Sequence, residues 1–330
     1  MKKNALFNVL NSAGVSKMLR LQKRNKLTVL SLHRISYQED FFWNPIRPTT
    51  FEKLLQYLVK YYSIISFSDI ATLKTDKNSK PYLILSFDDG YYDFYEHALP
   101  LLVKYDLPSN HNIVNACATN DQIIWTQRLN RIFSHCRDND ITGLIFEYNN
   151  RTLNYSSCNN NWMQFYLKVY NLLLTIPFKQ RLEMIAGKEN YFSVVAQERM
   201  MNWNEISECL RNKVEIGCHT YNHDTLSTIT DRSILYHEIA DSKTEIEQRL
   251  NTKINILALP NGQGNPGIYE IAGKAGIDHV LYVGNKANAL STYTNGEAIH
   301  DTYRINLVEE PMPEMILRTE LFHSKIRKYV

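Results

Sequence analysis

The sequence lacks the features of an exported or membrane-spanning protein. None of its 330 residues lie in a run of the ~18–20 consecutive apolar residues that a membrane-spanning helix requires, and no apolar stretch with a small-residue cleavage site follows the N-terminus. Its five cysteines are an odd number without a Cys-x-x-Cys pair, which argues against a disulfide ladder and a thiolate zinc knuckle. We therefore expect a cytoplasmic protein.

The net charge is also too small to indicate a nucleic-acid partner. The 37 Lys and Arg residues outnumber the 34 Asp and Glu residues by only three. Residues 1–26 nevertheless contain seven cations and no acid, interleaved with apolar residues such as Leu6 and Met18. This pattern is typical of an amphipathic helix at a membrane surface, here the inner face, and equally of a helix that packs on its own domain.

What the sequence has in quantity is apolar residues, at 44% of the chain, which predicts a globular protein with a sizeable core. Short apolar runs predict strands at 27–32, 82–87, 214–218, 254–259, 279–283 and 303–307. Helical patterns lie between several of them, at 50–61 with Thr50 as the N-cap and at 231–250. Strands that alternate with helices predict an α/β fold with a largely parallel sheet, open or closed.

Residues 120–200 interrupt this alternation. They combine helix-like patterns at 125–133 and 162–174 with an asparagine-rich stretch at 159–161. We predict an inserted, mostly helical subdomain, whose Trp125, Trp162 and Tyr155 pack in its core rather than line a cleft. The predicted organisation is a basic segment at 1–26 and an α/β unit at 27–330 that the insertion interrupts.

Polar residues follow two of the predicted strands. Asp88, Asp89 and Gly90 come after 82–87, while His219 and His223 come after 214–218. Active sites of parallel α/β proteins lie at the carboxyl ends of strands, and two histidines with one carboxylate form a three-ligand set for a divalent metal. Adjacent aspartates point in different directions, so one would bind metal while the other stays free as a base. Taken singly, Asp-Asp-Gly is also a common turn and His-x-x-x-His a common coincidence.

The same residues carry a family resemblance. Ser86-Phe-Asp-Asp-Gly90 and His219-Thr-Tyr-Asn-His223 resemble, in this order, the first two signature motifs of the polysaccharide deacetylases, the NodB-homology group of carbohydrate esterase family 4. Leu30-Ser-Leu-His33 resembles the Tyr-His opening strand of one branch. The resemblance covers about 27–118 and 200–310. It implies a distorted (β/α)7-type barrel that removes an N-acetyl group from an amino sugar.

The resemblance also implies roles for individual residues. Asp89, His219 and His223 would hold the metal, which is zinc or alternatively iron, cobalt or nickel. Such an ion lowers the pKa of water towards ~7, and Asp88 would act as the general base. The backbone N–H of Asn261, after Pro260 in the third motif, would stabilise the oxyanion.

The general acid and the third motif match the family pattern less closely than the first two motifs do. His33 follows the first strand and matches the acid of the Tyr-His branch, with His279 and His300 as alternatives; remaining histidines such as His111 are predicted to be ordinary helix or loop residues. The third motif has Ala258 in place of the usual arginine and Asn261 in place of an aromatic residue. Arg304 either supplies the missing cation that orients Asp88 or forms a structural ion pair.

The predicted substrate is an N-acetylated amino-sugar glycan or glycoconjugate, such as a lipid-linked intermediate met through the basic N-terminus. One alternative is a deformylase or another C–N amide hydrolase that uses the same site. Another is a non-catalytic glycan-binding protein of the same fold. Residues 262–267 match Gly-x-Gly-x-x-Gly, but Pro266 fits a dinucleotide site poorly, and we interpret the stretch as an active-site loop.

Overall fold

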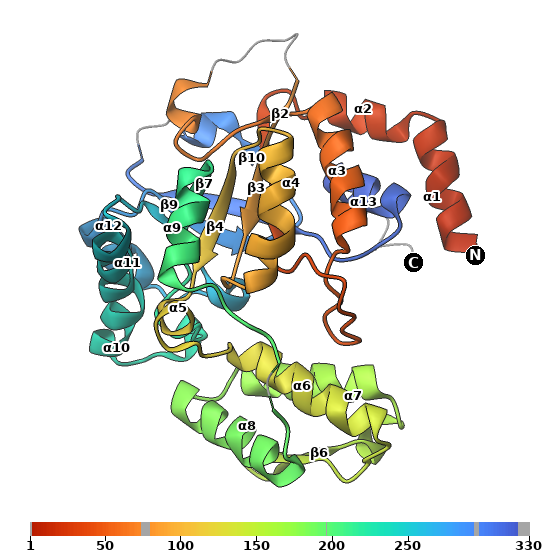
Figure 1. Ribbon diagram of the computed structural model, residues 1–330, viewed down its shortest axis with the longest axis vertical. Helices are drawn as coiled ribbons and strands as arrows, with labels where there is room; N and C mark the ends of the chain where they lie inside the picture. The colour runs from red at the N-terminus through yellow and green to blue at the C-terminus, as the bar shows by residue number, and fades with distance from the viewer. Residues whose placement is uncertain (1, 74–79, 196, 294–296, 323–330) are drawn as a thin grey trace.

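The computed structural model describes residues 2–73, 80–195, 197–293 and 297–322, and its centre is a closed barrel of seven parallel strands (Figure 1). Around the barrel the order is β1 (Lys26–Leu32), β3 (Tyr82–Phe87), β4 (Ser109–Ile113), β7 (Val214–Cys218), β8 (Ile256–Ala258), β9 (His279–Val283) and β11 (His300–Asn306). The barrel closes because β1 pairs with β3 on one side and with β11 on the other. The predicted (β/α)7-type fold is confirmed.

Three ranges of the predicted organisation are only partly described. Residue 1 of the basic segment, residue 196 of the insertion, and 74–79, 294–296 and 323–330 of the α/β unit lie outside the described residues. Two short strands extend the sheet beyond the barrel. β2 (Ser63–Ile64) pairs with β3, and β10 (Asn288–Ala289) runs antiparallel to β1.

Helices cover the outside of the barrel (Figure 1), and a large apolar core fills the space between the two layers. The helices are α3 (Pro48–Tyr61), α4 (Leu99–Lys104), α5 (Asn115–Asn120), α9 (Trp203–Arg211), α10 (Arg232–Tyr236), α11 (Ser242–Leu250), α12 (Ile268–Ala275) and α13 (Met312–Thr319). The expected N-cap of α3 is wrong. Pro48 opens this helix, because proline suits the first turn, and the Thr50 hydroxyl instead donates a hydrogen bond to Glu309.

The interior of the barrel is divided into an apolar end and a polar end. Near the amino ends of the strands, residues such as Leu27, Ile84 and Leu281 form an apolar cluster. Towards the carboxyl ends, Ser86, Asn110 and Asn112 form a buried hydrogen-bonded network. Because each buried amide here has a partner, polar groups are tolerated inside the barrel.

Strand β4 was not predicted, because its sequence Ser-Asn-His-Asn-Ile has no apolar pattern. All five of its residues are buried. The Ser86 hydroxyl donates to Asn110 Oδ1 at 2.7 Å, and Asn110 Nδ2 donates to Asn112 Oδ1 at 3.1 Å. Side-chain pairing thus replaces the apolar burial by which strands are usually recognised.

Residues between α5 and α9 form the insertion, which Figure 1 shows below the barrel. It consists of α6 (Trp125–Asp138), the hairpin β5 (Ile145–Tyr148) and β6 (Arg151–Asn154), α7 (Trp162–Leu173) and α8 (Phe178–Phe192), around an apolar core of its own. Trp125 is buried, and the Trp162 ring packs on Tyr155 with 4.5 Å between centroids, which confirms the predicted packing. Phe42, from the loop after β1, joins this core against Phe133 and Tyr166.

The basic segment folds as α1 (Lys2–Ser12) and α2 (Val15–Leu21). Helix α1 packs against α13, and Arg20 of α2 donates a hydrogen bond to Tyr57 of α3 at 2.7 Å. No helix in the described part of the chain is long and apolar enough to cross a membrane.

Gly217 of β7 provides the first test of this interior. A Cβ at this position would lie 2.1 Å from Asn112 Oδ1, and the hydrogen bonds of Asn112 keep that amide from moving away. We expect Gly217→Ala to lower the free energy of unfolding by about 1–3 kcal/mol, the usual effect of overpacking. Urea denaturation measures it. Gly143→Ala is the control, since its Cβ would meet nothing within 4 Å. Equal stability of the two variants would contradict the packing described.

Candidate metal centre

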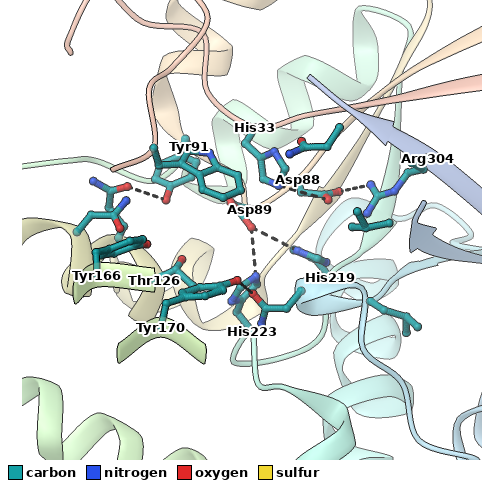
Figure 2. Close-up of a pocket in the computed structure, with 17 residues that line it drawn as sticks. His33, Asp88, Asp89, Tyr91, Thr126, Tyr166, Tyr170, His219, His223 and Arg304 are labelled. Atoms are coloured by element: carbon teal, nitrogen blue, oxygen red, sulfur yellow. Dashed lines mark hydrogen bonds and ion pairs between the residues drawn. The ribbon is translucent and has the colours of Figure 1, made fainter. Parts of the chain in front are cut away.

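Asp89, His219 and His223 come together at the carboxyl ends of the barrel strands (Figure 2). Asp89 follows β3, and His219 follows β7 directly. Asp89 Oδ1 lies 3.3 Å from His219 Nε2 and 3.4 Å from His223 Nε2, and all three side chains are buried. The structure therefore assembles the three residues that the motifs suggested as metal ligands.

The loops that present these side chains have an unusual backbone. Asp89, Thr220 and His223 have φ angles of 79°, 64° and 58°, in the left-handed region that non-glycine residues seldom occupy. The N–H of Gly90 donates to His111 Nε2 at 3.1 Å, which fixes the first of these loops. Strained backbone of this kind is concentrated at functional sites, where surrounding contacts hold it in place.

The donor set fits a divalent metal. The three ligand atoms lie within 4.8 Å of one another. His219 Nδ1 donates to the Ala258 carbonyl oxygen at 2.9 Å, and this leaves the lone pair of Nε2 directed at Asp89. Burial lowers the pKa of His223 to about 3, so its imidazole is neutral and able to coordinate. Two imidazole nitrogens and one carboxylate oxygen suit zinc, iron, cobalt or nickel.

The charges at this site favour a cation. Burial lowers the pKa of His219, but the nearby carboxylates of Asp88 and Asp89 outweigh it, and the net shift is upward. Burial likewise raises the pKa of Asp89, but His219, His223 and His33 outweigh it and hold the carboxyl below its usual range. Two buried carboxylates that stay ionised attract positive charge, either a proton on His219 or a metal ion.

Asp88 is held by two donors on one of its oxygens. Arg304 Nη1 and Asn112 Nδ2 each donate to Oδ1 at 2.7 Å. Burial raises the pKa of Asp88, but Arg304, followed by His219 and His33, outweighs it and keeps the group ionised. Arg304 is buried within β11, so it forms the predicted contact with Asp88 rather than a surface pair. Asn112 was not predicted as a site residue, because its strand β4 was not predicted either.

The predicted histidines have different positions in the structure. His33 Nε2 lies 3.9 Å from Asp88 Oδ2, and its ring meets Trp43 edge-on at 5.3 Å. His279 and His300 are the first residues of β9 and β11, at the end of the barrel opposite the site, so both alternatives for the acid are wrong. His111 was also misassigned, because it lies in β4 and supports Gly90.

The third motif forms the turn after β8. Asn261 lines the cavity beside Asp89 and His223, whereas Pro260 is buried and does not line it. The Asn261 side chain accepts a hydrogen bond from the Tyr170 hydroxyl at 2.7 Å. Its Nδ2 donates to Thr225 Oγ1 at 3.3 Å.

One cavity of about 180 Å³ contains this site, and the insertion forms one of its walls (Figure 2). Helix α6 contributes Thr126, Gln127 and Asn130, and α7 contributes Tyr166 and Tyr170. This wall was not predicted, because aromatic residues four apart on a helix are usually packing residues. The hydrogen bond from Tyr170 of α7 to Asn261 of the third motif, 91 residues away, shows that this helix reaches the site.

Comparison with known proteins agrees with this geometry. Residues 185–280, which include His219, His223 and Asn261, match the sequence model of the family described as polysaccharide deacetylase. No curated protein sequence gives a significant match.

Several solved structures share the fold. The Streptococcus pyogenes deacetylase PplD in complex with acetate has a TM-score of 0.59 and 17% identity, over 89% of this chain and 98% of that one. IcaB from Ammonifex degensii has a TM-score of 0.55 and 15% identity, over 90% of this chain and 97% of that one. A de-N-acetylase from Aggregatibacter actinomycetemcomitans has a TM-score of 0.52 and 17% identity, over 88% of this chain and 100% of that one. The chain thus carries the fold of these deacetylases, and the predicted resemblance to the polysaccharide deacetylases is confirmed over residues 185–280, while the branch with the Tyr-His opening strand stays a prediction.

The ligand assignment predicts the metal content. We expect about one divalent ion per chain by elemental analysis, and a loss of affinity of more than about 100-fold in His219→Ala and Asp89→Asn, since even outer partners of ligands change affinity by about 10–100-fold. Titration with Co²⁺, followed by its absorption, gives the affinity. The partly exposed His237→Ala is the control. Full metal content in all three variants would place the metal elsewhere.

Proposed function

We propose that the protein is a metal-dependent deacetylase that removes the N-acetyl group from an amino sugar of a glycoconjugate. The observation that supports this most is the buried group of Asp88, Asp89, His219 and His223 at the mouth of a polysaccharide deacetylase barrel. Asp89, His219 and His223 would hold the ion. When bound, such an ion polarises the acyl carbonyl and lowers the pKa of water.

Asp88 is suited to accept the proton of the attacking water. Its Oδ1 is occupied by Arg304 and Asn112, which leaves Oδ2 free for the proton. Because both donors fix the carboxylate, little reorganisation is needed at the moment of transfer. The water oxygen bonds to the carbonyl carbon, and the N–H of Asn261 would donate to the developing oxyanion.

His33 is suited to protonate the leaving nitrogen. Its Nε2 faces Asp88 Oδ2 at 3.9 Å, and its side chain is the partly exposed one of this pair. As the C–N bond breaks, the nitrogen takes the proton of the imidazolium and leaves as an amine. Acetate and an amino sugar are the products, and the proton on Asp88 restores His33 through solvent.

The size of the cavity supports a substrate that offers one sugar residue. Its volume of about 180 Å³ is below the ~300–1,000 Å³ of pockets that enclose drug-sized ligands. The insertion closes one side, so a long polymer has less access than the end of a conjugate. A formyl group would also fit this cavity, so N-formyl conjugates have to be compared with N-acetyl conjugates.

Acetate release from N-acetylglucosaminyl conjugates tests the proposed activity. We expect turnover by the metal-loaded protein, and a fall in kcat of about 10²–10⁴-fold in Asp88→Asn, the usual contribution of a general base. The exposed Asp106→Asn is the control. Metal content should be unchanged in both. Formate release from N-formyl conjugates alone would identify a deformylase, and full metal content without either product would identify a non-catalytic protein.

We also propose that residues 1–26 bring the protein to an anionic membrane surface, where a lipid-linked substrate would be found. The buried side of this segment is occupied, since Phe7 and Leu19 pack inward and Lys23 donates to the Thr319 carbonyl. The segment also exposes four large apolar side chains together with cations at positions 17 and 26, namely Leu6, Val9, Met18, Leu21, Lys17 and Lys26. Apolar groups flanked by lysines match the chemistry of a lipid interface.

Sedimentation with vesicles of phosphatidylcholine and phosphatidylglycerol tests this surface. We expect Leu6→Ser combined with Val9→Ser to lower the bound fraction by about tenfold or more, because each buried apolar side chain contributes about 1.5–3 kcal/mol. Val103→Ser, an equally exposed apolar residue on α4, is the control. Unchanged binding of the double variant would refute the proposal.

A further inference from the structure

Two tyrosines of the insertion occupy a wall of the cavity that the barrel does not provide. Tyr166 and Tyr170 lie one turn apart on α7, and both line the cavity. Figure 2 shows them on the opposite side of Asp89 and His223 from Arg304. We infer that Tyr170, supported by Tyr166, is the surface on which the sugar ring packs and so determines which glycan the site accepts. This inference rests on the proposed function.

The Tyr170 ring is fixed in orientation. Its hydroxyl donates to Asn261 Oδ1 at 2.7 Å, and its ring stacks on Trp125 and Tyr166 with centroids 5.6 and 6.0 Å apart. Burial raises the pKa of Tyr170 to about 12, so the hydroxyl stays a neutral donor. Tyr166 and Trp125 are buried, whereas Tyr170 retains an accessible surface beside the metal site. A ring held in this way loses little entropy when a ligand packs on it.

At the third motif the barrel presents a polar side chain to this wall instead of an aromatic ring. Asn261 has a φ of 56°, which asparagine tolerates and bulky side chains rarely adopt. Its side chain is also engaged on both ends, with Tyr170 and Thr225. The loop after β8 therefore offers a polar anchor, and the aromatic surface next to it belongs to α7.

A buried ion pair fixes the position of this wall relative to the metal site. Arg181 donates to Asp224 Oδ1 at 3.2 Å and to the carbonyl oxygens of Leu173 and Ile176, at the end of α7. Its guanidinium also lies 4.7 Å from the centre of the Trp125 ring. Since Asp224 adjoins His223, the helix that carries Tyr170 is attached to the loop that carries a ligand. The distance from wall to metal site is thus built into the fold.

Calorimetric binding of the methyl β-glycoside of N-acetylglucosamine to metal-loaded protein carrying Asp88→Asn tests the inference, because the probe then binds without turnover. We expect Tyr170→Ala to weaken binding by about tenfold or more, and Tyr170→Phe, which keeps the ring, to stay within about threefold. The exposed Tyr191→Ala, in the same insertion but away from the cavity, should bind as the parent does. Metal content is measured in each variant and should not change.

The outcomes separate the inference from the proposed function. Parent-like binding by Tyr170→Ala, or equal losses in Tyr170→Ala and Tyr170→Phe, would overturn the role of the ring. Absence of binding by the Asp88→Asn protein with Tyr170 intact would overturn that role as well. Binding that depends on the Tyr170 ring, in a protein that releases no acetate with Asp88 intact, would uphold the inference and refute the deacetylase activity.

Discussion

The hydrogen-bonded pair of Arg304 and Asp88 is the interaction on which the rest of the site depends. Both charges are buried inside the barrel, and the desolvation of two such groups is repaid only when their remaining polar atoms are satisfied. Asn112 supplies a second donor to Asp88, and Ser86 accepts from both Arg304 and Asn112. The pair therefore requires polar residues on β3, β4 and β11 at one level of the barrel. This requirement explains why the carboxyl end of the barrel is polar while the amino end is apolar.

The insertion is part of the site, because its residues contact the barrel loops that carry the site residues. Phe42, in the loop between His33 and α3, is buried in the insertion core. Arg181 reaches Asp224, next to His223, and Tyr170 reaches Asn261. A further network joins Arg131 of α6 to Glu198, and Glu198 to Arg34 beside His33. Three loops of the barrel mouth are thus positioned by one helical unit, which makes the shape of the cavity a property of both parts.

The limits of prediction follow from the range of each interaction. Strands 82–87, 214–218 and 279–283 have the predicted bounds, because each is a largely apolar run that stops at a polar residue or a glycine. Asp89, His219 and His223 were found because each lies just beyond such a run. The direction of a strand would have excluded His279, since a residue that opens a parallel strand lies away from the catalytic end. Strand β4 and Tyr170 had no local signal: the first depends on side-chain pairing with Ser86, and the second on a contact with Asn261.

The strained backbone at the barrel mouth shows how such a site is maintained. Asp89, Thr220, His223 and Asn261 all have positive φ angles, and for a β-branched residue such as Thr220 this conformation destabilises the fold by about 1–3 kcal/mol. All four lie in loops at the carboxyl ends of β3, β7 and β8, between two packed cores. Each loop is held by a hydrogen bond to another part of the chain. Gly90 binds His111, His219 binds the Ala258 carbonyl oxygen, and Asn261 binds Tyr170. The strain persists because rigid neighbours on both sides leave the loops no relaxed alternative, and the same rigidity keeps the ionised carboxylates facing one cavity.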